Sequence, residues 1–151
     1  MHREKSEKED RLIAAPSQRR QLILESVPAG SGEIGAWSAA LTDCRERTMK
    51  AIAGIDQSEL DWQPPFCANT IGTILYHIAL IESDWLYTEI LERPISEDLR
   101  ALLRLADRES NGELTNVRGE SANQHEHRLA RVRQDFRQAL ASMTFDRAQA
   151  Y

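Results

Sequence analysis

Apolar residues recur at steps of three and four over four stretches of the chain, and this spacing predicts helices. The stretches run from about Glu33 to Ile55, from Asn69 or Thr70 to about Glu92, from Ser96 to about Leu105, and from about Ser121 to Met143. Pro64, Pro65 and Pro94 bound the second stretch, since proline lacks the amide hydrogen that a helix interior needs. No segment alternates with a period of two, so the expected fold class is all-α.

Three of the predicted helices are long and one-sided, a pattern typical of an antiparallel, up-down helical bundle. Cys44 falls on the apolar face of the first helix and is expected in the core. Residues 1–20 are highly charged, so we expect a solvated tail before a bundle domain over residues 21–151. The last residues, 145–151, resemble a connector into another element, and the commonest bundle has one more long helix.

Composition narrows the class of protein. The chain has 151 residues, of which 41% are hydrophobic and 28% charged, and this fits one soluble domain with a core of its own. A net charge of -5 without a basic stripe argues against nucleic acid as a partner. The sequence shows no secretory signal and no apolar run near the ~20 residues that span a bilayer, so we expect no membrane contact. Its two cysteines suit a reduced, cytoplasmic protein.

His77 interrupts the apolar second helix and is the first candidate for chemistry. At about 100° per residue, it lies at the border of an apolar stripe, where a core meets a polar groove. The stripe consists of Ile71, Ile74, Leu75, Ile78, Ile81 and Trp85. The position suits a metal ligand, a catalytic base, or a histidine that only donates a hydrogen bond to a carbonyl. With no second ligand at i+3 or i+4, the spacing alone is not a metal motif.

Two carboxylates share this helix. Glu82 points into the apolar stripe, where an unpartnered carboxylate would have a raised pKa. It could orient a metal-bound water or a ligand, or it could pair with an arginine of a neighbouring helix such as Arg45 or Arg133. Asp84 lies near His77 in direction, so it either orients the imidazole or is solvated.

Several other polar residues form weaker patterns. Asp107 opens a segment that imitates a calcium loop, but Arg118 stands where the bidentate acid should be, so a turn is expected. His125 and His127 point about 160° apart on a helix, so at most one can face the core. Cys67 precedes the second helix without a visible base and is expected to be a buried or loop-end thiol.

The stretch LDWQPPFCANTIGTILYHIALIESDWLYTEIL, with ALTDCRERTMKAIAGI before it and HRLARVRQDFRQALASM after it, resembles the DinB-like family of metal-binding four-helix bundles. In that family, one histidine of the second helix and two from an H-x-x-x-H motif on the fourth bind a divalent metal. His77 matches the first ligand. This sequence contains no H-x-x-x-H, and neither His125 nor His127 has the spacing to replace it. We therefore expect the fourth helix to be missing.

The resemblance implies a protein related to thiol-dependent transferases, which use low-molecular-weight thiols such as mycothiol, or to hydrolase-like enzymes. The implied cofactor is zinc, nickel or iron, and members are often dimers. Because a catalytic ion needs about three protein ligands, His77 alone leaves open whether this chain is an enzyme. Two hypotheses follow: a metalloprotein with an incomplete site, or a non-catalytic helical module that forms a homodimer through its open apolar face.

Overall fold

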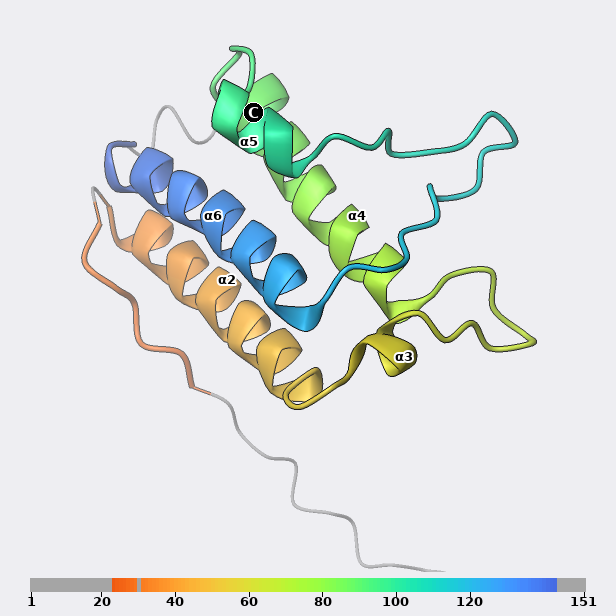
Figure 1. Ribbon diagram of the computed structural model, residues 1–151. Helices are drawn as coiled ribbons and strands as arrows, with labels where there is room; N and C mark the ends of the chain where they lie inside the picture. The colour runs from red at the N-terminus through yellow and green to blue at the C-terminus, as the bar shows by residue number, and fades with distance from the viewer. Residues whose placement is uncertain (1–22, 30, 144–151) are drawn as a thin grey trace, which may run out of the picture.

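The computed structural model describes residues 23–29 and 31–143, which form a bundle of three main helices (Figure 1). Its elements are α2 (Gly32–Ala51), α3 (Gln57–Leu60), α4 (Ile71–Asp84) with its π-helical continuation η2 (Trp85–Ile90), α5 (Glu97–Leu102) and α6 (Ala122–Ala141). The described residues otherwise hold only one isolated β-bridge, so the all-α prediction is confirmed. The predicted tail over residues 1–20 and the connector over residues 145–151 lie outside the described residues, and the missing fourth helix stays a prediction.

Side-chain caps explain where the helices begin. The hydroxyl oxygens of Ser31, Thr70 and Ser96 each accept a hydrogen bond from the backbone amide three residues later. At α6, the side chain of Gln124 accepts from the amide of Ser121 at 2.8 Å. These contacts satisfy amides that have no partner inside the helix, which is why the observed starts agree with the predicted ones.

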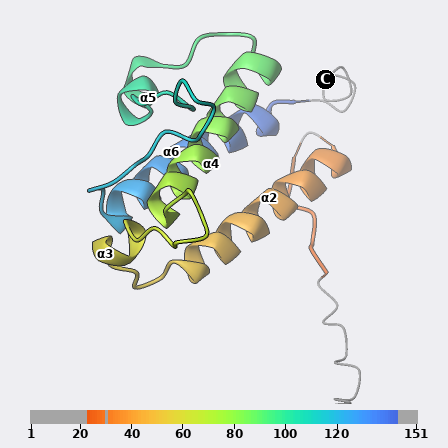
Figure 2. The ribbon, with the colours of Figure 1, turned by 90° about the vertical axis from the view of Figure 1, so that its right-hand side faces the viewer.

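The relative direction of the helices differs from the predicted up-down order. α2 runs antiparallel to α6, but α4 and α6 run parallel (Figures 1 and 2). In the pairs that touch, the residue numbers increase along both helices, from Tyr76 with Arg128 to Tyr87 with Asp135, as they do only between parallel helices. The physical reason is the long connection over residues 103–121, which returns the chain to the end where α4 began.

The second predicted helix also changes character before its end. From Trp85 to Ile90 the backbone is a π-helix, in which the amide of Leu91 donates to the carbonyl of Leu86 at 2.9 Å. The wider turn buries both Leu86 and Tyr87. Glu92 then adopts a left-handed conformation, with φ of 48°, and the helix stops there.

The core lies between α4 and α6, and the predicted apolar stripe agrees with it only in part. Leu75 of the stripe is buried, but so are Thr73, Tyr76, Ala79 and Ser83, while Ile71, Ile74 and Trp85 of the stripe are exposed. The buried face is rotated because polar groups on it have partners: the hydroxyl of Thr73, for example, accepts from the amide of Val117 at 3.0 Å.

Cys44 is exposed, contrary to the prediction. The reason is that α2 packs mainly on α6, so its face with Trp37 and Cys44 is left lining an open apolar groove. The groove has a volume of about 500 Å³, and its lining includes Trp37, Ala40, Leu41, Cys44, Phe136 and Leu140. Trp37 remains 54% exposed. Periodicity along α2 predicted an apolar face but could not show what covers it.

Candidate functional site

His77 is held by a carboxylate that lies 30 residues further along the chain. Its Nδ1 is 2.6 Å from Oδ1 of Asp107, which follows α5, and the imidazole is 25% exposed. With Nδ1 donating to the carboxylate and no described residue bonded to Nε2, the lone pair of Nε2 can bind a metal or accept a proton. The partner is thus a carboxylate and not the carbonyl that a purely structural histidine was expected to use.

Asp84 does not orient this imidazole. It is exposed and accepts a hydrogen bond from the hydroxyl of Thr88 at 2.9 Å, so the solvated alternative is confirmed. Asp107 is the residue that sequence reasoning missed in this role. In the sequence it stands out only as the start of an imitation calcium loop, and no spacing rule links a loop residue to a helix residue that far away.

The described residues provide one metal-ligand position and not a closed site. Among residues 23–29 and 31–143, no three side chains of His, Cys, Asp or Glu come together as a metal would require. His127 is exposed, and the thiol of Cys67 donates to the carbonyl of Asn69 at 3.6 Å. A divalent ion bound here would need ligands from elsewhere, so we derive no reaction step through a metal.

Glu82 lies between two arginines of two other helices. Its Oε2 accepts from Nη2 of Arg45 on α2 at 2.6 Å, and its Oε1 accepts from Nη2 of Arg133 on α6. The three side chains are between 11% and 16% exposed. Burial lowers the pKa of Arg45, Glu82 opposes this shift, and the charge of Arg133 adds to it. The predicted pairing is confirmed, with both arginines at once.

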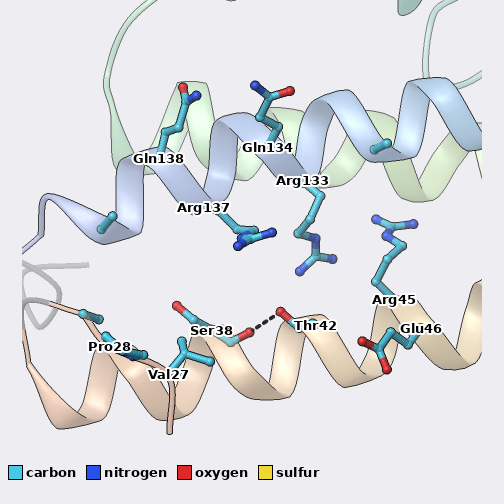
Figure 3. A pocket seen from close by; sticks show the side chains of 13 residues that line it. Val27, Pro28, Ser38, Thr42, Arg45, Glu46, Arg133, Gln134, Arg137 and Gln138 are labelled. Carbon is cyan, nitrogen blue, oxygen red and sulfur yellow. Dashed lines mark hydrogen bonds between the residues drawn. The ribbon is translucent and has the colours of Figure 1, made fainter.

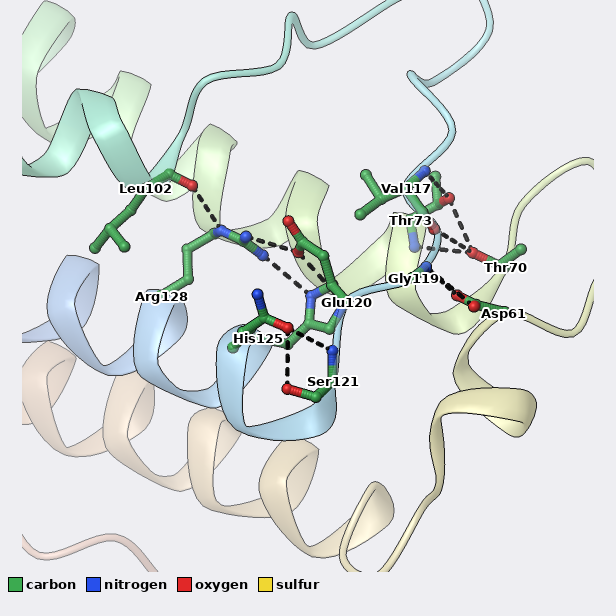
Figure 4. A network of polar contacts seen from close by, with 11 residues as sticks. Asp61, Thr70, Thr73, Leu102, Val117, Gly119, Glu120, Ser121, His125 and Arg128 are labelled. Atoms are coloured by element: carbon green, nitrogen blue, oxygen red, sulfur yellow. Dashed lines mark hydrogen bonds and ion pairs between the residues drawn. The ribbon is translucent and has the colours of Figure 1, made fainter.

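His125 belongs to a buried polar network (Figure 4). Arg128 donates from Nε to the carbonyl of Leu102 at 2.8 Å and from Nη2 to Oε2 of Glu120 at 2.7 Å. Its Nη1 lies 3.1 Å from Nδ1 of His125. Because a guanidinium only donates, Nδ1 must accept and the proton of the neutral imidazole sits on Nε2. The guanidinium also lies over the ring of Tyr76, 4.4 Å from its centroid.

The network fixes the long connection to the bundle. His125 is 1% exposed, and a Cβ at Gly72 would stand 3.2 Å from its Nε2, so glycine lets α4 approach α6 closely here. Arg128 thus holds Leu102, the residue just before the connection, and Glu120 near its end, and His125 has a structural role. The expectation that only one of His125 and His127 faces the core is confirmed.

A sequence profile of the DinB superfamily matches residues 40–151, which is well over half of the chain. This chain belongs to the DinB superfamily. No curated protein and no solved structure matches it. The match covers all three main helices of this DinB domain except the first turns of α2. No helix in the described part of the domain is long and apolar enough to cross a bilayer.

Removing the carboxylate of Glu82 should destabilise the domain. Glu82→Ala leaves Arg45 and Arg133 as neighbouring buried cations, so we expect a loss of about 3 kcal/mol in the free energy of unfolding, measured with urea. Glu109→Ala, in an exposed loop, is the control and should change little. Similar small losses for the two variants would contradict the role given to Glu82.

Acid should destabilise the domain through His125. Burial, followed by the charge of Arg128, lowers its pKa from the ordinary 6.5, while Glu120 and Asp61 oppose the shift. Since the unfolded imidazole binds the proton more readily, this contribution is fully present above about pH 6.5 and is lost as the pH falls below that value.

Unfolding measured in urea between about pH 7.5 and 5.5 tests this linkage. In His125→Gln, the free energy of unfolding should fall less steeply with decreasing pH than in the unchanged chain, by at most about 1.4 kcal/mol per pH unit for one proton. His127→Gln, at an exposed histidine, should keep the slope of the unchanged chain. An unchanged slope in His125→Gln would rule the linkage out.

Proposed function

We propose that this DinB domain binds a divalent metal ion for which His77 supplies one ligand. The observation that carries the proposal is the 2.6 Å contact between Nδ1 of His77 and Asp107, which fixes the ring and leaves Nε2 as the donor atom. A carboxylate on the second nitrogen is the usual outer partner of a metal-binding histidine and fixes the orientation of its ring. The other ligands would come from outside the described residues or from another chain.

The reaction class proposed for a completed site is that of a thiol-dependent transferase or a hydrolase-like enzyme. Its support is membership of the superfamily, together with the resemblance by which His77 would correspond to the first family ligand. A bound zinc, nickel or iron ion would lower the pKa of a coordinated thiol or water. On the side of the protein, Asp107 would hold the ring orientation, and partial burial would limit the access of water to the imidazole.

Metal binding tests this proposal directly. We expect Zn²⁺ titrated into the metal-free chain to shift the ¹⁵N resonance of Nε2 of His77, and His77→Ala to abolish that site. Asp107→Asn should weaken binding roughly tenfold, because the ring loses its ionic partner. His127→Ala is the control, since that ring is exposed on another helix and should have no effect. Zinc affinity unchanged in His77→Ala would refute the assignment.

A second candidate function is that of a non-catalytic module that forms a homodimer. The observation that favours it is the open apolar groove, at which Trp37 is 54% exposed. Ala40 and Cys44 follow Trp37 along the same face of α2, and such small residues allow another helix to approach closely. An antiparallel copy of α2 would place its own tryptophan against these small residues, which is the self-complementary contact of a two-fold dimer.

Sedimentation separates this candidate from a monomeric domain. The unchanged chain should sediment as a dimer, and Trp37→Glu should sediment as a monomer, because a charge in the buried interface would have no partner. Trp62→Glu replaces a tryptophan of similar exposure, 58%, that lies outside the groove, and this variant should remain dimeric. A compact monomer for the unchanged chain at every concentration would exclude the dimer.

A further inference from the structure

A second groove lies between α2 and α6, on the side where the segment before α2 runs beside them. It has a volume of about 840 Å³, and Figure 3 shows side chains of both helices converging on it. The two helices are antiparallel, so the start of α2 meets the end of α6 at one end of the groove. Arg45 and Arg133 lie at the other end, and Arg137 reaches in from α6 between the two (Figure 3).

Positive charge exceeds negative charge at this groove. The guanidinium groups of Arg45, Arg133 and Arg137 line it, and the opposing carboxylates are Glu46 in the lining and Glu82 behind the first two arginines. Three cations thus face two anions. The excess is a single positive charge, which a monoanion would balance.

Several donors of these arginines also lack acceptors. Arg133 is 9% exposed, and its Nε and Nη1 have no hydrogen-bond partner among the described residues. The same holds for Nε of Arg45. A buried donor without an acceptor costs free energy, so an anionic oxygen near these groups is favoured.

The opposite end of the groove is mainly apolar, and the segment that forms its wall is joined to α2. Val27, Pro28 and Ala29 form one wall, and Ala141 closes the α6 side. Gly35 holds this wall against α2, because a Cβ there would stand 2.2 Å from the carbonyl oxygen of Val27. The amide of Val27 donates to the carbonyl of Gly35 at 3.3 Å. The groove therefore combines a cationic end with an apolar end.

We propose that this groove binds a small amphipathic carboxylate, with its head group at Arg45, Arg133 and Arg137 and its apolar chain toward Pro28 and Ala141. A carboxylate matches the single excess charge, and the planar guanidinium of Arg137 suits its two oxygens. The apolar wall supplies the contact for the chain. The site is separate from His77, and it requires neither a metal nor a dimer.

Titration of the full chain with decanoate tests the site. We expect decanoate to bind at least about tenfold more tightly than 1-decanol, which has the same chain without the charge. Arg137→Gln should weaken decanoate binding about tenfold and leave decanol unchanged. Because Arg137 is exposed and makes no contact with Glu82, this variant is expected to fold normally, which unfolding in urea verifies.

Two controls separate this groove from other surfaces. Arg104→Gln removes an exposed arginine outside the groove and should leave decanoate affinity unchanged. Trp37→Ala alters the separate groove lined by Trp37 and Cys44 and should also leave decanoate affinity unchanged. Equal affinities for decanoate and decanol would overturn the proposal, as would a loss of decanoate binding in Trp37→Ala with none in Arg137→Gln.

Discussion

The arrangement of the three main helices depends on the carboxylate of Glu82. This residue lies on a predominantly apolar helix and forms ion pairs with one arginine of α2 and one of α6. Apolar contacts are not directional, so they allow neighbouring helices to rotate or slide at little cost. Two charge-assisted hydrogen bonds from different helices restrict this rotation and sliding, since the desolvated charges must remain in contact. α2 packs mainly on α6 and has few contacts with α4, so the ion pair between Arg45 and Glu82 is its main direct link to α4.

The polar connection over residues 103–121 is ordered by a second set of contacts. The hydroxyl of Tyr76 accepts a hydrogen bond from the amide of Leu105 at 2.8 Å, and the hydroxyl of Thr73 accepts one from the amide of Val117. The carboxylate of Asp61 accepts one from the amide of Gly119. Side chains from α4 and from the turn before it thus accept backbone hydrogen bonds that a sheet or helix would otherwise satisfy. Between these attachments, Asp107 is brought to His77, and the candidate metal ligand gains its partner.

Helix positions followed from sequence because caps, prolines and apolar periods are local signals. Pairing of Glu82 with Arg45 or Arg133 was one of two alternatives that the sequence left open, since a carboxylate in an apolar stripe needs a partner but the pattern does not name it. The exposure of Cys44 and Ile74 did not follow, because periodicity locates an apolar face but not the neighbour that covers it. Asp107 and the parallel direction of α6 depend on the path of a long loop, which no local pattern encodes.

The parallel pairing of α4 and α6 affects the order in which the chain can fold. Contacts between these helices join residues far apart in sequence, 51 positions for Glu82 with Arg133 and 48 for Tyr87 with Asp135. A short hairpin between antiparallel helices would close a much smaller loop and lose less chain entropy. In this domain the whole connection must be confined when the principal interface forms, a topology that favours slower folding than a helical hairpin.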